Sequence, residues 1–231
     1  RGNLPPRQVR HGASANPPIG TAVAHDRTKV LEAAQKCLAK GQHDRAILEY
    51  RKLVEDDPKD VRTWLKIGDL YTRKGMNKEA CDTYQRVADQ YAEQGFFLKA
   101  VAVFKQILKL DPTRMDALVR LAKMYEQLQL VSDALATYEQ LSQTYTKQGD
   151  PDKALGMLGR MAEIDASNVP VRIRYAEALS KAGKSEEAAR AFEAGAALLK
   201  EQGRIDDYVK VAERMLYHRS DNIDVARDVA E

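Results

Sequence analysis

The sequence has few of the residues that build catalytic or metal centres. Its 231 residues include only two cysteines and four histidines, and no histidine stands near a cysteine or carboxylate at metal-ligand spacing. It has no glycine-rich phosphate loop and no nucleophile elbow. The carboxylates occur at positions typical of exposed helix charges. We therefore expect a protein that is not an enzyme and that uses no metal or cofactor.

Long apolar runs and an excess of one charge are also missing. No apolar stretch approaches about 18 residues, so we expect no transmembrane segment. Lys and Arg number 37 against 34 Asp and Glu, and the segment 1–26, with three arginines and one aspartate, holds most of the net charge of +3. The rest is near neutral, whereas nucleic-acid binding needs dense positive charge. We therefore expect no nucleic-acid partner.

The two cysteines, Cys37 and Cys81, fall on the apolar faces of predicted helices. The simplest interpretation is that both are small buried hydrophobes in a reducing compartment, so we expect a cytoplasmic protein. The sequence starts at Arg1 rather than at Met, so it carries no information on a signal peptide.

Residues 1–26 contain four prolines and no helical period, which is typical of an extended tail or linker. So little apolar content does not offset the entropy lost on ordering. We therefore expect this tail to dock on a surface of its own chain or of a neighbour. Apolar contacts would come from Leu4, Val9, Ile19 and Val23, and Arg7 and Arg10 would face carboxylates.

From Thr28 onward a helical period takes over, and the sequence repeats itself with a period of 54. Pro58, Pro112, Ala166 and Ser220 stand at this spacing, as do Gly41, Gly95, Gly149 and Gly203. A period of this size predicts a solenoid of stacked helices, joined by short turns so that consecutive helices are antiparallel. We expect helices at about 28–40, 43–56, 60–74, 77–94, 97–110, 114–128, 131–148, 151–164, 168–182, 185–202 and 204–218, with a last one beginning near 222. That last helix is cut off, so we expect this chain to be a fragment of a longer protein.

A second pattern lies inside the repeat, where small and aromatic residues alternate at fixed spacing. Small residues such as Gly68 and Ala80 let two helices approach closely, and aromatic side chains fill the space beside them. Three copies carry the pattern: Trp64, Ile67, Gly68, Tyr71, Gly75, Ala80, Tyr84 and Val87; Leu118, Leu121, Ala122, Tyr125, Ala134, Tyr138 and Leu141; Arg172, Tyr175, Ala176, Leu179, Ala188, Phe192 and Gly195.

This spacing resembles the tetratricopeptide repeat (TPR) over roughly residues 28–231. The resemblance implies an all-α fold, a TPR-like α-solenoid of antiparallel helices in a right-handed superhelical array, with a repeat domain over residues 27–231. A plain TPR array has two helices in a repeat of about 34 residues, whereas the longer period seen here adds a third helix to each unit. Because three is odd, equivalent helices of successive units should alternate in direction, and the family's usual concave groove does not carry over.

The resemblance implies a protein-interaction scaffold or adaptor, and its overall character is similar to large bacterial TPR proteins of motility or polarity machineries. The alternative is a structural subunit that packs against copies of itself or other subunits of a large assembly. A clamp for an acidic peptide terminus would need convergent Lys, Arg and Asn, and Asn is missing. A solvated mixed-charge face is therefore the simpler interpretation of the candidate partner-binding positions Arg62, Leu65, Asp69, Arg73, Arg120 and Lys123.

Phe96 and Phe97 are the other candidate partner-binding residues. They stand at a turn whose equivalents carry Gln42-His43, Asp150-Pro151 and Arg204-Ile205, none of them aromatic. One interpretation is that a ring staples the start of helix 97–110 to the preceding hairpin. The other is an aromatic anchor for a partner.

Overall fold

The computed structural model describes residues 25–219 and residue 227, and the chain divides into two compact units, Arg1–Pro58 and Lys59–Glu231. The described part is all-α, as the sequence predicts. Within each unit, a helix packs mainly on the helix before it and the helix after it.

The first unit contributes a helical hairpin of α1 (Arg27–Ala39) and α2 (His43–Asp56). Asp26 caps α1, since its carboxylate accepts from the backbone nitrogens of Thr28 and Lys29 at 3.1 and 3.3 Å. Ala34 of α1 and Tyr50 of α2 are buried in the hairpin. A hydrogen bond from the His25 backbone to Asp56, at 2.7 Å, lowers the pKa of that carboxyl and ties the ends of the hairpin together.

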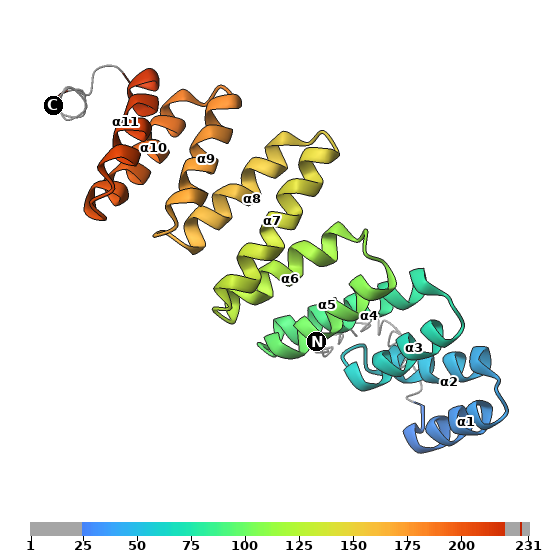
Figure 1. The fold of residues 1–231 in the computed structure, drawn as a ribbon. Coiled ribbons are helices and arrows are strands. Elements are labelled where there is room, and N and C mark those ends of the chain that lie inside the picture. Colours follow the sequence, from blue (N-terminus) through green and yellow to red (C-terminus); the bar gives the residue numbers. More distant parts are fainter. Residues whose placement is uncertain (1–24, 220–226, 228–231) are drawn as a thin grey trace, which may run out of the picture. The chain divides into compact units, whose positions relative to one another are not determined.

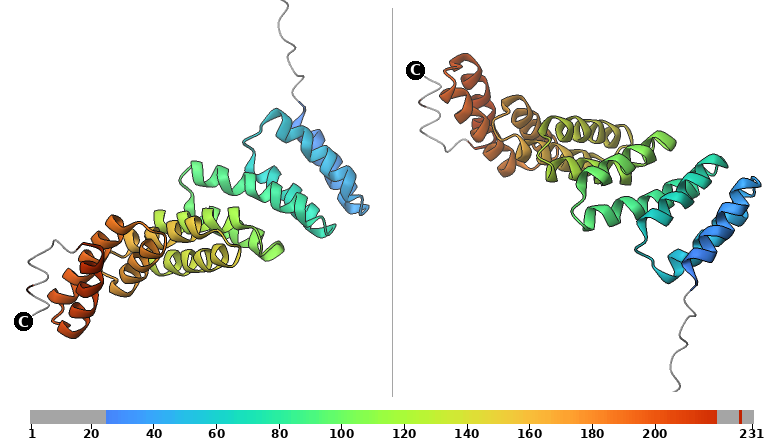
Figure 2. Two further views of the ribbon diagram at one scale, coloured as in Figure 1. Left: turned by 90° about the horizontal axis from the view of Figure 1, so that it is seen from above. Right: turned by 90° about the horizontal axis from the view of Figure 1, so that it is seen from below.

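The second unit is a stack of nine described helices in which consecutive helices run antiparallel (Figures 1 and 2). Their starts recur at the spacing of the sequence repeat, since α5, α8 and α11 begin at the equivalent positions Phe97, Pro151 and Ile205. The helices are α3 (Val61–Arg73), α4 (Asn77–Glu93), α5 (Phe97–Leu110), α6 (Met115–Gln127), α7 (Val131–Lys147), α8 (Pro151–Ile164), α9 (Val169–Lys181), α10 (Ser185–Glu201) and α11 (Ile205–His218). Of the last helix expected, near residue 222, the structure describes residue 227 alone, which is helical.

Alternation of direction places the turns on two opposite edges of this unit. The α4–α5, α6–α7, α8–α9 and α10–α11 turns lie along one edge, and the α3–α4, α5–α6, α7–α8 and α9–α10 turns lie along the other (Figure 1). Most tight turns contain a glycine in the left-handed region, such as Gly95 with φ +77°. At the α6–α7 turn that position is held by Gln129, the only non-glycine residue with positive φ (55°) in the described part of the chain.

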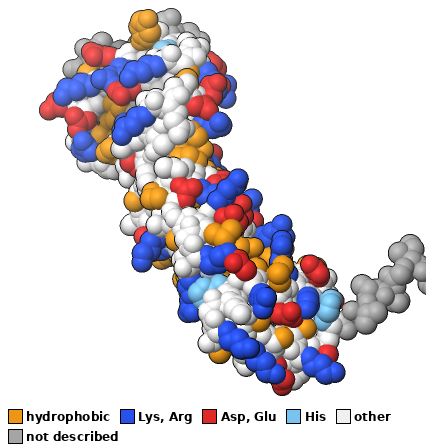
Figure 3. All heavy atoms as spheres, turned by 90° about the vertical axis from the view of Figure 1, so that its right-hand side faces the viewer, with side chains coloured by type: hydrophobic (Ala, Val, Ile, Leu, Met, Phe, Trp, Pro, Cys, Tyr) orange, Lys and Arg blue, Asp and Glu red, His pale blue; other side chains and the backbone are white. Residues whose placement is uncertain are grey.

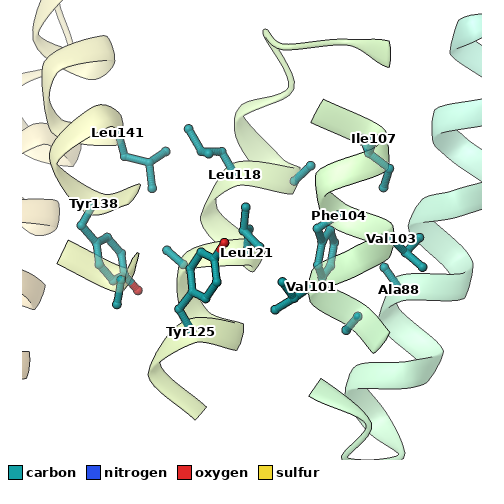
Figure 4. Packing of buried hydrophobic residues seen from close by; sticks show 14 of the residues in the cluster. Ala88, Val101, Val103, Phe104, Ile107, Leu118, Leu121, Tyr125, Tyr138 and Leu141 are labelled. Atoms are coloured by element: carbon teal, nitrogen blue, oxygen red, sulfur yellow. The ribbon is translucent and has the colours of Figure 1, made fainter. Parts of the chain in front are cut away.

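The core of the second unit consists of two clusters of aliphatic and aromatic side chains between the helices. Figure 4 shows Val101 and Phe104 of α5 facing Leu121 and Tyr125 of α6, and all four are buried. This cluster extends from Ala80 to Val171, and a second cluster runs from Leu155 to Met215.

Close approach of α3 and α4 depends on Gly68. A Cβ placed on Gly68 would lie 2.6 Å from Cε1 of Tyr84, a buried ring on α4. The Tyr84 hydroxyl donates to Asp69 at 2.6 Å and accepts from the Gln106 side chain of α5 at 2.8 Å. Burial and the neighbouring Asp69 carboxylate raise the pKa of Tyr84 to about 12, so the phenol stays protonated and links α3, α4 and α5.

Candidate protein-interaction surface

The α4–α5 turn places Phe96 partly in solvent. Its backbone nitrogen donates to the carbonyl of Tyr91 at 2.8 Å, and it stands just before α5 without a side-chain capping bond. The ring meets Tyr91 edge-on at 6.4 Å between centroids, and the Lys99 ammonium lies 4.5 Å from the Phe96 centroid. Phe97 is half-buried and Phe96 is exposed. The turn thus has a contact suited to a staple and a partly exposed ring suited to an anchor.

The candidate residues on α3 have different surroundings. Leu65 is half-buried and packs against the core, and Asp69 is engaged by the Tyr84 hydroxyl. Arg62 and Arg73 are exposed. These two arginines are therefore the α3 candidates with accessible charge.

On α6, Arg120 pairs with Asp89 of α4 across the intervening α5, whereas Lys123 is exposed. The same kind of pair recurs one unit later, where Arg174 of α9 donates to Glu139 of α7 at 2.9 and 3.1 Å. Arg120, one of the charges expected at a partner surface, is thus engaged in an ion pair that links two helices separated by a third.

A polar exchange accompanies these two ion pairs. Asp89 of α4 is equivalent to Gln143 of α7, and Gln85 is equivalent to Glu139. The acid and the amide, which lie one helical turn apart, therefore occupy exchanged positions in the two helices. In each case the amide donates to the acid, from Gln85 to Asp89 at 3.1 Å and from Gln143 to Glu139 at 2.7 Å. In either arrangement, the arginine pairs with a carboxylate that also accepts a hydrogen bond from an amide.

The candidate residues therefore fall into three groups rather than one site: α3, the α4–α5 turn and α6. Positive and negative side chains are interspersed on the face shown in Figure 3, which agrees with a solvated mixed-charge face. The tail candidates Leu4, Arg7, Val9, Arg10 and Ile19 lie outside the described residues.

The described region contains no cluster suited to metal binding, since no three His, Cys, Asp or Glu side chains gather there. Cys81 is buried, which raises the pKa of its thiol, and Cys37 is half-buried; both are free thiols. None of the helices within residues 25–219 combines the length and apolar character that a bilayer crossing requires.

Sequence reasoning missed five exposed apolar residues in the described part of the second unit: Leu98, Leu130, Val131, Ile205 and Tyr217. A comparison of equivalent positions in the repeat would have found the first, because Leu98 is equivalent to Asp44, Asp152 and Asp206.

The chain is 24% identical over 182 residues to chicken (Gallus gallus) DnaJ homolog subfamily C member 3, a match that covers 61% of this chain and 36% of that protein. The chain therefore spans about a third of this curated relative.

Solved structures with similar helices include BtubC from P. vanneervenii, 17% identical over 81% of this chain and 91% of that one, with a TM-score of 0.41. MamA from Desulfovibrio magneticus is 17% identical over 78% of this chain and 98% of that one, with a TM-score of 0.27.

Three tetratricopeptide-repeat family models match the chain, at residues 91–147 and 145–205, at residues 34–75 and at residues 62–93. Together they span residues 34–205, most of the described helices, and they coincide with the small and aromatic positions that pack α3 on α4 and α6 on α7. The chain belongs to the tetratricopeptide repeat family.

Proposed function

We propose that this chain is a non-enzymatic scaffold that binds partner proteins on preformed helical surfaces. The repeat family implies protein partners. The observation that supports the proposal most directly is Phe96, an exposed aromatic ring at a turn whose equivalents are Gln42, Asp150 and Arg204. An exposed ring at a rigid helical corner is the kind of residue that anchors protein interfaces.

The proposed contacts are of two kinds. Phe96 and Phe97 supply an apolar anchor, and the exposed Arg62, Arg73 and Lys123 supply charge at the rim. Leu65, Asp69 and Arg120 would assist mainly by holding the helices that carry these residues, because each is engaged within the unit.

The test is affinity purification with the full-length protein, comparing wild type with a Phe96→Ser/Phe97→Ser variant. An anchor predicts unchanged melting and loss of the co-eluting partner. A staple predicts a clear fall in melting temperature instead. No co-eluting protein with the wild type would contradict the scaffold function itself.

The alternative is a structural subunit that packs against copies of itself or other subunits. The exposed apolar side chains at the α4–α5 and α6–α7 turns, which lie on one edge, favour it as a second candidate, since such an edge would suit repeated packing. Light scattering across concentrations separates the two: a scaffold stays monomeric, whereas a structural subunit forms growing oligomers. A salt-independent absence of binding to mixed RNA would support the expectation of no nucleic-acid partner.

We also propose a domain organisation, a location and a cellular machinery for this chain. We propose residues 1–26 as a linker, residues 27–231 as the repeat domain, and a cytoplasmic location, which suits the two free cysteines. A bacterial motility or polarity machinery is the proposed setting, by analogy with large bacterial TPR proteins. The identity of the co-eluting partner tests it.

A further inference from the structure

Two neighbouring turns on one edge of the second unit break the pattern of their own repeat. At the α4–α5 turn, Leu98 is 68% exposed. The equivalent residues Asp44, Asp152 and Asp206 are acids in the first turns of α2, α8 and α11. An acid there is favourable because it faces the positive end of the helix dipole. The exposed leucine has no such local benefit.

Phe96, one position before α5, departs in the same direction. Its equivalent Asp150 caps α8 by accepting from the Lys153 backbone at 3.2 Å, whereas α5 has neither a side-chain cap nor an acid in its first turn. Phe96 is nevertheless 48% exposed. Phe96 and Leu98 are thus exposed apolar side chains at positions where the equivalent turns carry polar or charged residues.

The α6–α7 turn adds a second exposed apolar pair. Leu130 and Val131 are 40% and 39% exposed, and their equivalents are Met76-Asn77 and Lys184-Ser185. Beside them lies a hollow of about 540 Å³, lined by Glu126, Gln129, Val131, Arg160, Glu163 and Ile164. The charges in this lining are matched internally, because Arg160 pairs with both Glu126 and Glu163.

Both turns lie on the same edge, and α5 and α6 pack directly on each other between them (Figure 1). The turns of the opposite edge contribute none of the exposed large apolar side chains in the described residues of the second unit. Four of the six exposed large apolar side chains in the described residues of the second unit therefore lie on these two adjacent turns, and the other two are Ile205 at the α10–α11 turn and Tyr217 near the end of α11.

We propose that Phe96, Leu98, Leu130 and Val131 form a single docking surface, here called the turn surface. Its occupant is a segment of a partner protein that carries large apolar side chains next to a carboxylate. The apolar requirement follows from the four exposed side chains and the hollow beside Val131. The requirement for a carboxylate follows from the start of α5, where Lys99 and a helix N-terminus without a side-chain cap supply positive charge and the first turn has no acid. This inference rests on the proposed scaffold function and names the site and partner chemistry.

A protein segment fits the turn surface better than a lipid bilayer does. Peripheral membrane surfaces combine apolar side chains with clusters of Lys and Arg. Here Lys99 is the basic residue at the first turn, and Asp133 stands in the first turn of α7. Packed helices lie about 8–10 Å apart, so the α4–α5 and α6–α7 turns, which are two helices apart, are separated by roughly 15–20 Å. A partner segment in helical conformation would need about 10–14 residues to reach from one turn to the other.

The first experiment gives α5 the two acids that the equivalent turn before α8 carries, Asp150 and Asp152. We expect a Phe96→Asp/Leu98→Asp variant of the full-length protein to melt at or above the wild-type temperature, because Asp at these positions caps α5 and faces its dipole. We expect its partner recovery in affinity purification to fall roughly tenfold or more. Ile205→Asp, a similarly exposed first-turn residue on the same edge, and Tyr217→Ser, an exposed aromatic away from it, are matched controls that should retain the partner.

Recovery of the partner by the double variant at the wild-type level would overturn the turn surface while leaving the scaffold function intact. A wild-type protein that recovers no partner would instead contradict the scaffold function, and the turn surface would fall with it. A variant that loses the partner and also melts lower contradicts the capping argument, and Leu98→Ser alone then separates lost docking from lost folding.

The second experiment identifies the occupant by photo-crosslinking. A photoreactive phenylalanine analogue is placed at position 98, 131 or 217 of the full-length protein in its native cells. We expect positions 98 and 131 to crosslink one segment of one partner, containing large apolar residues beside Asp or Glu, and position 217 to give no such product. Crosslinks to a second copy of this chain, crosslinks to lipid with binding to phosphatidylcholine–phosphatidylglycerol vesicles, or equal products at position 217 would each overturn the proposal.

Discussion

Gly68→Ala and Gly156→Ala are the same substitution at two helix-interior positions, and we expect opposite effects on stability. A Cβ on Gly68 would lie 2.6 Å from the Tyr84 ring, whereas a Cβ on Gly156 meets no atom within 4 Å. Both variants gain helix propensity, since alanine in a helix interior is favoured over glycine by about 0.8–1 kcal/mol. Only Gly68→Ala must also displace a neighbour.

The displaced ring has little freedom. Tyr84 is fully buried, and its hydroxyl is held by Asp69 and Gln106. Overpacking a filled core costs about 1–3 kcal/mol. Loss of the hydrogen bond from the Tyr84 hydroxyl to the charged Asp69 carboxylate costs roughly 1.5–3 kcal/mol. The propensity gain does not offset the sum, so we expect Gly68→Ala to destabilise by about 2–4 kcal/mol, following, and Gly156→Ala to stabilise by about 0.5–1 kcal/mol.

Thermal and urea unfolding followed by circular dichroism measure both effects, and roughly 2–4 °C in Tm corresponds to 1 kcal/mol at this chain length. Gly159→Ala and Gly195→Ala should fall between the extremes, because their added Cβ atoms would lie 3.2 Å from Tyr175 and 3.6 Å from Ile173. A Gly68→Ala variant as stable as Gly156→Ala would refute the close-approach argument.

Other substitutions test the packing and the ion pairs. Ala80→Leu, Ala134→Leu and Ala188→Leu should each destabilise by roughly 1–3 kcal/mol in denaturant unfolding, because all three side chains are fully buried; unchanged melting of all three would contradict the repeat alignment. Asp89→Gln should lower stability by about 0.2–1 kcal/mol at low salt, and adding Gln85→Glu should restore it by recreating the Glu139–Gln143 arrangement; no restoration would show that the two arrangements are not interchangeable. Hydrogen bonding to Arg174 lowers the pKa of Glu139, so its stabilisation is present above the unfolded-state pKa of about 4.3 and is lost as pH falls through the folded value. The Tm of wild type should therefore fall more steeply below about pH 4.3 than that of Arg174→Gln, and parallel curves would contradict this.

Much of the helical architecture could be predicted because it is determined by local sequence patterns. The expected helices 43–56, 97–110 and 151–164 agree with α2, α5 and α8 at both ends, since the turn residues and the apolar period act within a few positions. Close packing at Gly68 followed from the small residue opposite an aromatic one. The family assignment followed from the same positions.

The candidate surface was predicted less completely because exposure depends on which residues neighbouring helices cover. Arg120 and Asp69 looked outward by sequence, yet each is engaged by another helix, through Asp89 and Tyr84. Leu130 fits an apolar helical pattern, and only the packed structure places it in solvent. Leu98 stands where the three equivalent positions carry aspartate, so the sequence does hold a signal of its exposure. The division of the chain at Pro58 also has no marker that distinguishes it from the same position at Pro112.

An odd number of helices per unit gives the core and the surface different periods. The core repeats with every unit, but a turn reappears on the same edge only after two units, so the α4–α5 turn shares its edge with the α10–α11 turn and not with the α7–α8 turn. Phe97 and Ile205, two units apart, occupy the matching place on that edge, whereas Pro151 lies on the other. Gain or loss of one unit by duplication or deletion would preserve every core contact and yet move each downstream binding turn to the opposite edge. Only changes by pairs of units would keep a partner's sites in line, so array length in this lineage should be inherited in steps of two.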